Sequence, residues 1–298
     1  MLKKLMKYEW KETRTVGLIF LGVLVFAALL GVLSIQFTAW SITYESGNGN
    51  SGIMSLTSMF SAFFSFFIYT ISLSGTIYGI MIYLAVRFYK TMYTDEGYLL
   101  HTLPVTKHQI LISKIVIGAA WMGILYGVMI LSFIIFMVSL ASVLSSGSFF
   151  EILRQIPDYL AQMAEFMTSV IGSEWGFTAL MTHYVVSILL LCLIGLPAQL
   201  INLYGAISLG QLFNKHRVLW AILFSVGIGF GQSLLAYVVS IFLMVGTTLG
   251  SMAVPGSETF PMHVYAFQWD ANWIVSLIIA IVLYKVSHTI LTRKLNMG

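Results

Sequence analysis

IVIGAAWMGILYGVMILSFIIFMVSLASVLSSGSFF is the sequence of residues 115–150, a run of 36 residues without one Asp, Glu, Lys or Arg. A helix needs about 20 apolar residues to cross the hydrocarbon core of a bilayer. In lipid its backbone groups must be hydrogen-bonded internally, which a helix achieves by itself. The run shows none of the polar–apolar alternation of a strand. It therefore predicts a membrane-spanning helix.

The same pattern recurs along the whole chain. Four more uncharged stretches occupy residues 15–44, 46–86, 175–214 and 218–257. A shorter run, 271–284, ends at Lys285, whose ammonium group can snorkel to the interface. Only 9% of the residues are charged, against about 25% in soluble domains. We predict an all-α integral membrane protein with a single domain over residues 1–298. Its six predicted spans cover about 16–37, 59–86, 115–144, 177–204, 218–246 and 271–290.

The distribution of basic residues predicts the orientation of these spans. Of the 15 Lys and Arg residues, 14 fall in the segments that six crossings place on one side. Only Arg154 falls on the other side, together with seven of the 11 acidic residues. Since Lys and Arg concentrate on the cytoplasmic side, both chain ends are predicted to lie on the cytoplasmic side of the membrane. The same bias explains the net charge of +4 without a nucleic-acid partner.

Residues 1–15, MLKKLMKYEWKETRT, combine four lysines with apolar residues at roughly helical spacing. Such a segment is typical of an amphipathic helix that lies on the membrane surface and contacts lipid headgroups. The alternative is a disordered basic start that only sets the topology.

The motifs of the common catalytic sites are missing from the sequence. It contains no Gly-Lys dipeptide, hence no phosphate-binding P-loop, and neither His-Glu-x-x-His nor Gly-x-Ser-x-Gly. A lone cysteine, Cys192, forms neither an intrachain disulfide nor a metal cluster. We therefore predict no catalytic residue, no metal ligand and no cofactor bound by this chain. No Asp or Glu lies in the middle of a predicted span, which weakens the case for an ion-coupled carrier without removing it.

The connection 87–114 is the most informative segment. Thr94 or Asp95 can cap a short helix that has Glu96 in its first turn and ends at Pro104. Thr106 and Gln109 have the spacing of a capping box for the helix of the third span. The short helix carries an apolar cluster, which either binds a partner or packs on its own domain: Tyr98, Leu99, Leu100 and Leu103.

Residues 95–104, DEGYLLHTLP, with Lys107 and Gln109 after them, resemble the first cytoplasmic loop of bacterial type-2 ABC-exporter permeases. Residues 7–11, KYEWK, and the six-span layout also resemble that family. The resemblance implies an interfacial elbow helix at residues 1–15 and a coupling helix between spans 2 and 3. The coupling residues that it implies are Asp95, Glu96, Gly97, Tyr98, Leu99, Leu100, Leu103 and Pro104.

In the family, the coupling helix docks into a groove of a separate ATPase subunit, which binds ATP and Mg²⁺. Two ATPases and two permeases, identical or homologous, make one transporter. Its cargo includes peptides, antibiotics and lipids. The present sequence departs from the family in its large outer segment, 145–176. An amphipathic pattern there predicts a helix, either on the outer surface or as a lid over the outer mouth.

Polar residues inside the predicted spans have two interpretations. Either they line a transport pathway, or they satisfy backbone and side-chain groups within the helix bundle. These candidate pathway residues are Gln199, Asn202, Gln232 and Tyr237.

Three functions therefore stay open at the level of sequence. The first is the permease subunit of an ATP-driven exporter with an amphipathic cargo. The second is an ATP-independent secondary transporter or channel. The third is a non-transporting membrane protein with an immunity or sensor role.

Overall fold

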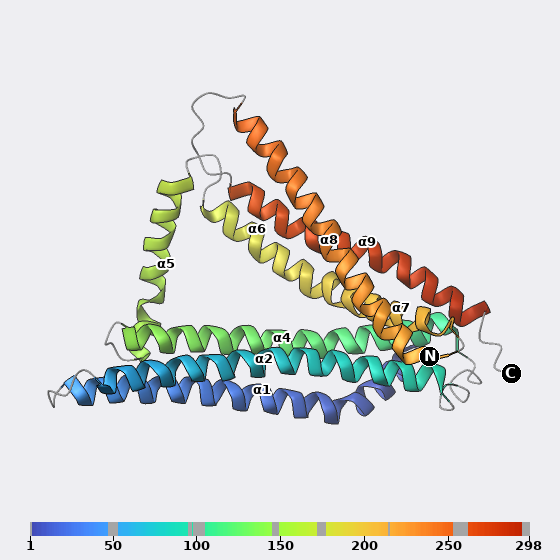
Figure 1. Cartoon of the computed structure of the whole chain (residues 1–298), viewed down its shortest axis with the longest axis horizontal. Helices are drawn as coiled ribbons and strands as arrows, with labels where there is room; N and C mark the ends of the chain where they lie inside the picture. The colour runs from blue at the N-terminus through green and yellow to red at the C-terminus, as the bar shows by residue number, and fades with distance from the viewer. Residues whose placement is uncertain are drawn as a thin grey trace. The chain divides into compact units, whose positions relative to one another are not determined.

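Figure 1 shows the computed structural model of the chain. It describes residues 2–46, 53–94, 97, 105–144, 149–171, 177–213, 215–252 and 262–293. Within these ranges the chain is helical with short turns and contains no strand, so the predicted all-α class is confirmed. The helices are α1 (Leu2–Ser46), α2 (Ile53–Tyr93), α4 (Lys107–Leu144), α5 (Phe149–Ile171), α6 (Phe177–Leu190), α7 (Leu196–Gly210), α8 (Arg217–Met252) and α9 (Met262–Arg293), with a π-helical turn, η1 (Leu191–Gly195), between α6 and α7.

Six stretches of the described helices are long and apolar enough to cross a membrane, which agrees with the predicted number of spans. They indicate a multi-pass membrane protein. The stretches are Leu2–Thr38, Phe63–Tyr93, Lys107–Ser142, Met181–Gly210, Arg217–Gly246 and Trp273–Thr292.

The start of the chain differs from the expectation of a separate surface helix. α1 runs without a break from Leu2 to Ser46, because no proline or glycine interrupts residues 2–16. The elbow role of residues 1–15 stays a prediction.

The fourth span is interrupted at Pro197, as its sequence indicates. Pro197 lies in the first turn of α7, directly after the π-helical turn η1. Proline has no backbone N–H and clashes with the carbonyl four residues earlier. A local π-helical turn is one way in which a helix accommodates such a residue.

The predicted helix in the outer segment 145–176 is present as α5. Ile152 is buried, whereas Phe150, Leu160 and Phe166 are exposed. Both predicted roles of this helix, on the outer surface or as a lid, stay predictions.

The helices pack as two compact units. The first contains Met1–Glu9, Leu84–Ala119 and Gln162–Gly298, and the second contains Trp10–Tyr83 and Ala120–Ala161. Because α2 and α4 continue from one unit into the other, the predicted single domain stays a prediction.

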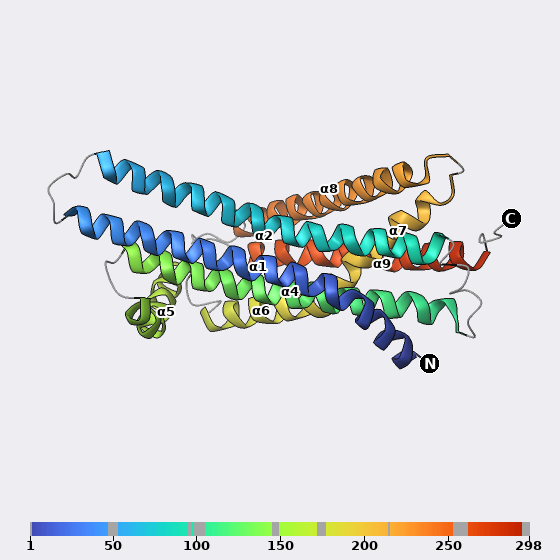
Figure 2. The ribbon, with the colours of Figure 1, turned by 90° about the horizontal axis from the view of Figure 1, so that it is seen from below.

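In the second unit, parts of α1, α2 and α4 lie side by side (Figure 2). The ring of Tyr69 stacks on Phe136 at 4.5 Å between centroids. Its hydroxyl group lies 3.0 Å from Ser132 Oγ. Gly31 allows this approach, because a Cβ there would lie 3.1 Å from the Tyr69 ring. Tyr69 thus joins α2 to α4 through both an aromatic and a polar contact.

Replacing Tyr69 with Phe is expected to lower the free energy of unfolding by about 1 kcal/mol, because the buried hydrogen bond between Tyr69 and Ser132 is lost. Thermal unfolding of the purified protein in detergent measures the change. Tyr78→Phe is the matched control, since Tyr78 is 67% exposed. Equal effects of the two substitutions would contradict a role for the buried hydroxyl group.

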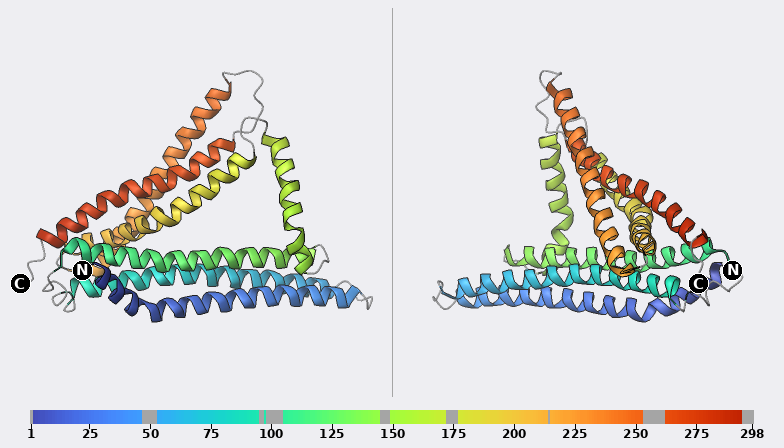
Figure 3. Two further views of the ribbon diagram at one scale, coloured as in Figure 1. Left: turned by 180° about the vertical axis from the view of Figure 1, so that it is seen from behind. Right: turned by 45° about the vertical axis from the view of Figure 1, so that its right-hand side comes forward.

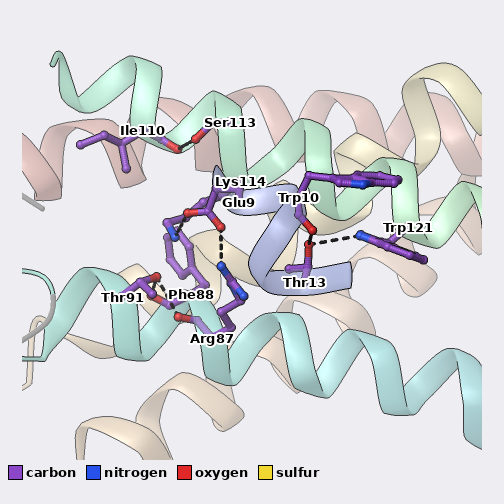
Figure 4. A network of polar contacts seen from close by, with 10 residues as sticks. All are labelled: Glu9, Trp10, Thr13, Arg87, Phe88, Thr91, Ile110, Ser113, Lys114 and Trp121. Atoms are coloured by element: carbon purple, nitrogen blue, oxygen red, sulfur yellow. Dashed lines mark hydrogen bonds and ion pairs between the residues drawn. The ribbon is translucent and has the colours of Figure 1, made fainter. Parts of the chain in front are cut away.

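A second contact in this unit joins α1 to α4. The rings of Trp10 and Trp121 stack at 4.8 Å. Trp121 Nε1 donates a hydrogen bond of 3.1 Å to Thr13 Oγ1 (Figure 4). A Cβ at Gly17 would lie only 2.5 Å from the Trp121 ring, so α1 needs a glycine where the indole covers it.

In the first unit, α7 packs against both α8 and α9 (Figure 3). Two glycines of α7 permit the close packing. A Cβ at Gly205 would lie 2.8 Å from Leu283 of α9, and a Cβ at Gly210 would lie 2.7 Å from the backbone nitrogen of Ala221 in α8. The beginning of α1 and the end of α9 lie at the same end of this unit (Figures 1 and 2).

Candidate functional site

Three charged side chains of the first unit meet between the beginning of α1, the last turns of α2 and the first turns of α4. Glu9 Oε2 accepts a hydrogen bond of 2.8 Å from Arg87 Nη2, and Glu9 Oε1 accepts one of 2.7 Å from Lys114 Nζ (Figure 4). The side chains of Glu9 and Lys114 are only 8% and 4% exposed. Charged groups are buried at this level only when they are paired. We call these three residues the ion-pair cluster.

The helices set the geometry of the ion-pair cluster. Arg87 lies six residues before the last residue of α2, and Lys114 lies seven residues after the first residue of α4. At 1.5 Å per residue, both are about 10 Å from the connecting segment. Glu9, near the beginning of α1, reaches both. The cluster therefore joins α1 to α2 and α4 at the same distance from the segment that connects α2 to α4.

The last turns of α2 are also fastened to α7. The rings of Phe88 and Tyr204 stack at 4.1 Å between centroids, with 9° between their planes. Tyr93 donates a hydrogen bond of 2.8 Å from its hydroxyl group to Ser208 Oγ. Phe88, Tyr204 and Ser208 are all buried. The end of α2 is thus held by α7 up to its final residue.

The first residues of α4 are fastened to α9 in a similar way. Lys107 Nζ donates a hydrogen bond to the backbone oxygen of Leu291. His108 Nδ1 lies 2.6 Å from the hydroxyl oxygen of Tyr284. Thr106 caps α4, because its Oγ1 accepts a hydrogen bond of 3.4 Å from the backbone nitrogen of Gln109. This confirms the hydroxyl half of the predicted capping box.

Of the eight predicted coupling residues, the structure describes Gly97. The other seven, Asp95, Glu96, Tyr98, Leu99, Leu100, Leu103 and Pro104, lie outside the described residues. Gly97 is buried, and its backbone nitrogen donates a hydrogen bond of 2.8 Å to the oxygen of Thr94. A Cβ at Gly97 would lie 2.8 Å from the carbonyl oxygen of Met92. A glycine therefore lets the chain fold back on the end of α2.

The candidate pathway residues separate into two groups. Asn202 of α7 donates from Nδ2 to Gln232 of α8 at 3.2 Å and to Ser276 of α9 at 3.4 Å. The buried Oδ1 of Asn202 has no hydrogen-bond partner among the described residues. Gln199 lies nearby in the sequence and is partly buried, whereas Tyr237 is 69% exposed and does not join this cluster.

A further polar cluster was not predicted from the sequence. Asp270 Oδ1 accepts hydrogen bonds of 3.0 Å from Ser187 Oγ and from Trp273 Nε1. Asp270 Oδ2 lies 3.2 Å from His183 Nε2. His183 and Ser187 of α6 are four positions apart and hence lie on one helix face. This spacing is the only feature of the sequence that could have indicated the cluster. Two of the six stretches that can cross the membrane begin at Met181 and at Trp273, so this cluster lies near the beginning of both.

These arrangements are contacts between helices, and they show no chemistry of a catalytic centre. Within the described ranges, no group of three or more His, Cys, Asp or Glu residues could hold a metal ion. Both cations of the ion-pair cluster are directed at Glu9, so the cluster is built to hold helices in place.

Comparison of the chain with models of protein families, with curated proteins and with solved structures gave no match. The described ranges, with their six stretches that are long and apolar enough to cross a membrane, define the class as a multi-pass membrane protein.

Proposed function

We propose that the chain is the permease subunit of an ATP-driven exporter of the type-2 ABC class, in the cytoplasmic membrane of a bacterium. Residues 95–104 would bind an ATPase subunit, which forms a dimer and holds ATP and Mg²⁺. A second permease subunit would complete the transporter. The cargo would be an amphipathic peptide, antibiotic or lipid-like molecule, because the interior of the spans is largely uncharged.

The observation that supports this proposal is the anchoring of both sides of the segment 94–106. On one side, Phe88 and Tyr93 are held by α7, and on the other side, Lys107 and His108 are held by α9. The ion-pair cluster joins the same two helix ends to α1. Because close-packed interiors transmit displacement rather than absorb it, a push on this segment would move several spans together. A coupling element needs this property.

Leu99→Asp combined with Leu103→Asp is expected to abolish binding of the ATPase subunit, because it places two carboxylates in a predicted apolar contact. We expect at least about a ten-fold loss of co-purified ATPase activity, which corresponds to a loss of about 1.4 kcal/mol in binding. The measurement is ATP hydrolysis by the complex purified from native membranes in mild detergent.

Leu212→Asp is the control, since Leu212 is 40% exposed in the turn after α7. It adds one carboxylate to another connection between spans and should leave the ATPase bound. If the double variant retained full ATPase association and transport, the coupling role of residues 95–104 would be wrong.

The Asp270 cluster supports one alternative, a secondary transporter that works without ATP. Ionisable groups within spans commonly mark ion or proton pathways, and Asp270 with His183 is such a pair near the end of two spans. The two functions differ in their energy source. Transport by the purified chain alone, in vesicles without nucleotide, would favour the secondary transporter and exclude the exporter.

A further inference from the structure

The beginning of α4 and the end of α9 carry four basic residues in the first unit, and two of them are in ring contact. His108 and His288 lie with their ring centroids 6.2 Å apart, nearly perpendicular to each other. Lys107 directly precedes His108, and Lys285 lies one turn before His288, exposed on the surface of α9. We call Lys107, His108, Lys285 and His288 the basic patch.

No carboxylate pairs with the basic patch among the residues that the structure describes. Glu9 already accepts hydrogen bonds from Arg87 and Lys114. Asp270 lies 15 residues before Lys285 in the same helix, which is about 22 Å along its axis. Lys107 donates to the carbonyl oxygen of Leu291, a neutral acceptor. Within the described ranges, no carboxylate therefore competes with an added anion for the patch.

An apolar stripe on α9 leads to the basic patch. Ile278, Ile281 and Val282 precede Lys285 by seven, four and three residues and thus share its helix face. They are 56%, 52% and 56% exposed. The stripe belongs to the stretch Trp273–Thr292, which is apolar enough to cross a membrane. Along this face of α9, an exposed apolar surface is followed directly by an exposed ammonium group.

We propose that the basic patch binds the phosphate of an anionic phospholipid headgroup, with an acyl chain of that lipid along Ile278, Ile281 and Val282. Along α9, exposed apolar side chains are followed by basic ones. This order matches a phospholipid, whose hydrocarbon chains lead to a charged phosphate. Basic residues between the ends of membrane helices bind anionic lipid headgroups through the same complementarity. The amphipathic lysine side chain can place its charge at headgroup level.

The stripe also distinguishes a lipid from a soluble anion. Lys285 lies seven residues inside the end of the apolar stretch at Thr292, which is about 10 Å along the helix. A free phosphate ion gains nothing from the apolar residues beside Lys285. A phospholipid gains from both parts, because its chain covers the stripe while its phosphate meets the patch.

The experiment is a titration of the purified full-length chain with dioleoyl phosphatidylglycerol or dioleoyl phosphatidylcholine, followed by native mass spectrometry. We expect tighter binding of the anionic lipid. Lys285→Gln should weaken its binding about five-fold, since one basic residue near the headgroups contributes about that factor. Lys285→Gln combined with His288→Gln should weaken it further, and Lys285→Arg should retain it.

Lys215→Gln combined with His216→Asn is the matched control, because it removes the same residue types from the turn after α7. Asn at 216 suits the positive φ of 56° at that residue. The proposal is overturned if the control weakens binding as much as the patch variant, if both lipids bind equally, or if inorganic phosphate displaces phosphatidylglycerol at equal concentration. The last result would assign the patch to a free anion. Should the double variant fail to fold, the single exposed change Lys285→Gln decides.

Discussion

Replacing Glu9 with Gln is expected to destabilise the protein more than any other single substitution in the ion-pair cluster. The change removes the carboxylate that the partly buried Arg87 and the buried Lys114 both contact. Removing one member of a buried ion pair typically costs about 3–5 kcal/mol, because an uncompensated charge stays in a medium of low dielectric constant. Because two cations contact this one carboxylate, we expect Glu9→Gln to lower the free energy of unfolding by an amount within that range. Thermal unfolding in detergent, followed by circular dichroism, measures it.

Glu12→Gln is the matched control, because Glu12 lies one turn further along α1 and is exposed. A change at an exposed site is usually within about 0.5 kcal/mol. The double variant Glu9→Gln with Lys114→Met should recover part of the loss, since it replaces one of the two cations that contact Glu9 with an unbranched apolar side chain of similar length. Equal destabilisation by the two glutamate variants would show that the buried pairing contributes nothing.

This cluster illustrates which contacts the sequence could not predict. Glu9 is separated from Arg87 by 78 residues and from Lys114 by 105. In the sequence, all three residues belong to charged segments that set the orientation of the spans. Nothing local distinguishes a charge that faces water from one that is buried against another helix. The number of spans, in contrast, follows from uninterrupted apolar length, which is a local property.

The candidate pathway residues show the same limit. Gln232 and Tyr237 are five residues apart, which separates them by about 140° around a helix. They could not share one face, and the structure accordingly leaves Tyr237 exposed while Gln232 contacts Asn202. Ser276, the third member of that cluster, gave no signal, because serines are frequent along all of these helices. Only packing of α7, α8 and α9 reveals it.

Gly210→Ala is expected to have the second large effect, at the end of α7. The added Cβ would lie 2.7 Å from the backbone nitrogen and 2.8 Å from the Cα of Ala221 in α8. Backbone atoms cannot turn aside as the end of a side chain can, so α7 and α8 would have to separate. Overpacking of this kind costs about 1–3 kcal/mol. Because the turn between the two helices spans only residues 211–216, the strain cannot be spread over a long connection.

Gly227→Ala in α8 is expected to change the stability in the opposite direction, within the same pair of helices. A Cβ at Gly227 meets nothing within 4 Å, and alanine is favoured over glycine inside a helix by about 1 kcal/mol. The two identical chemical changes should therefore shift the thermal unfolding midpoint in detergent in opposite directions, down for Gly210 and up for Gly227. If both raised the midpoint, helix propensity would dominate and the backbones of α7 and α8 would not be in close contact. If only Gly210→Ala lowered the midpoint, α7 and α8 would be shown to be in close backbone contact. The proposed transmission of a displacement from α2 through α7 requires such contacts.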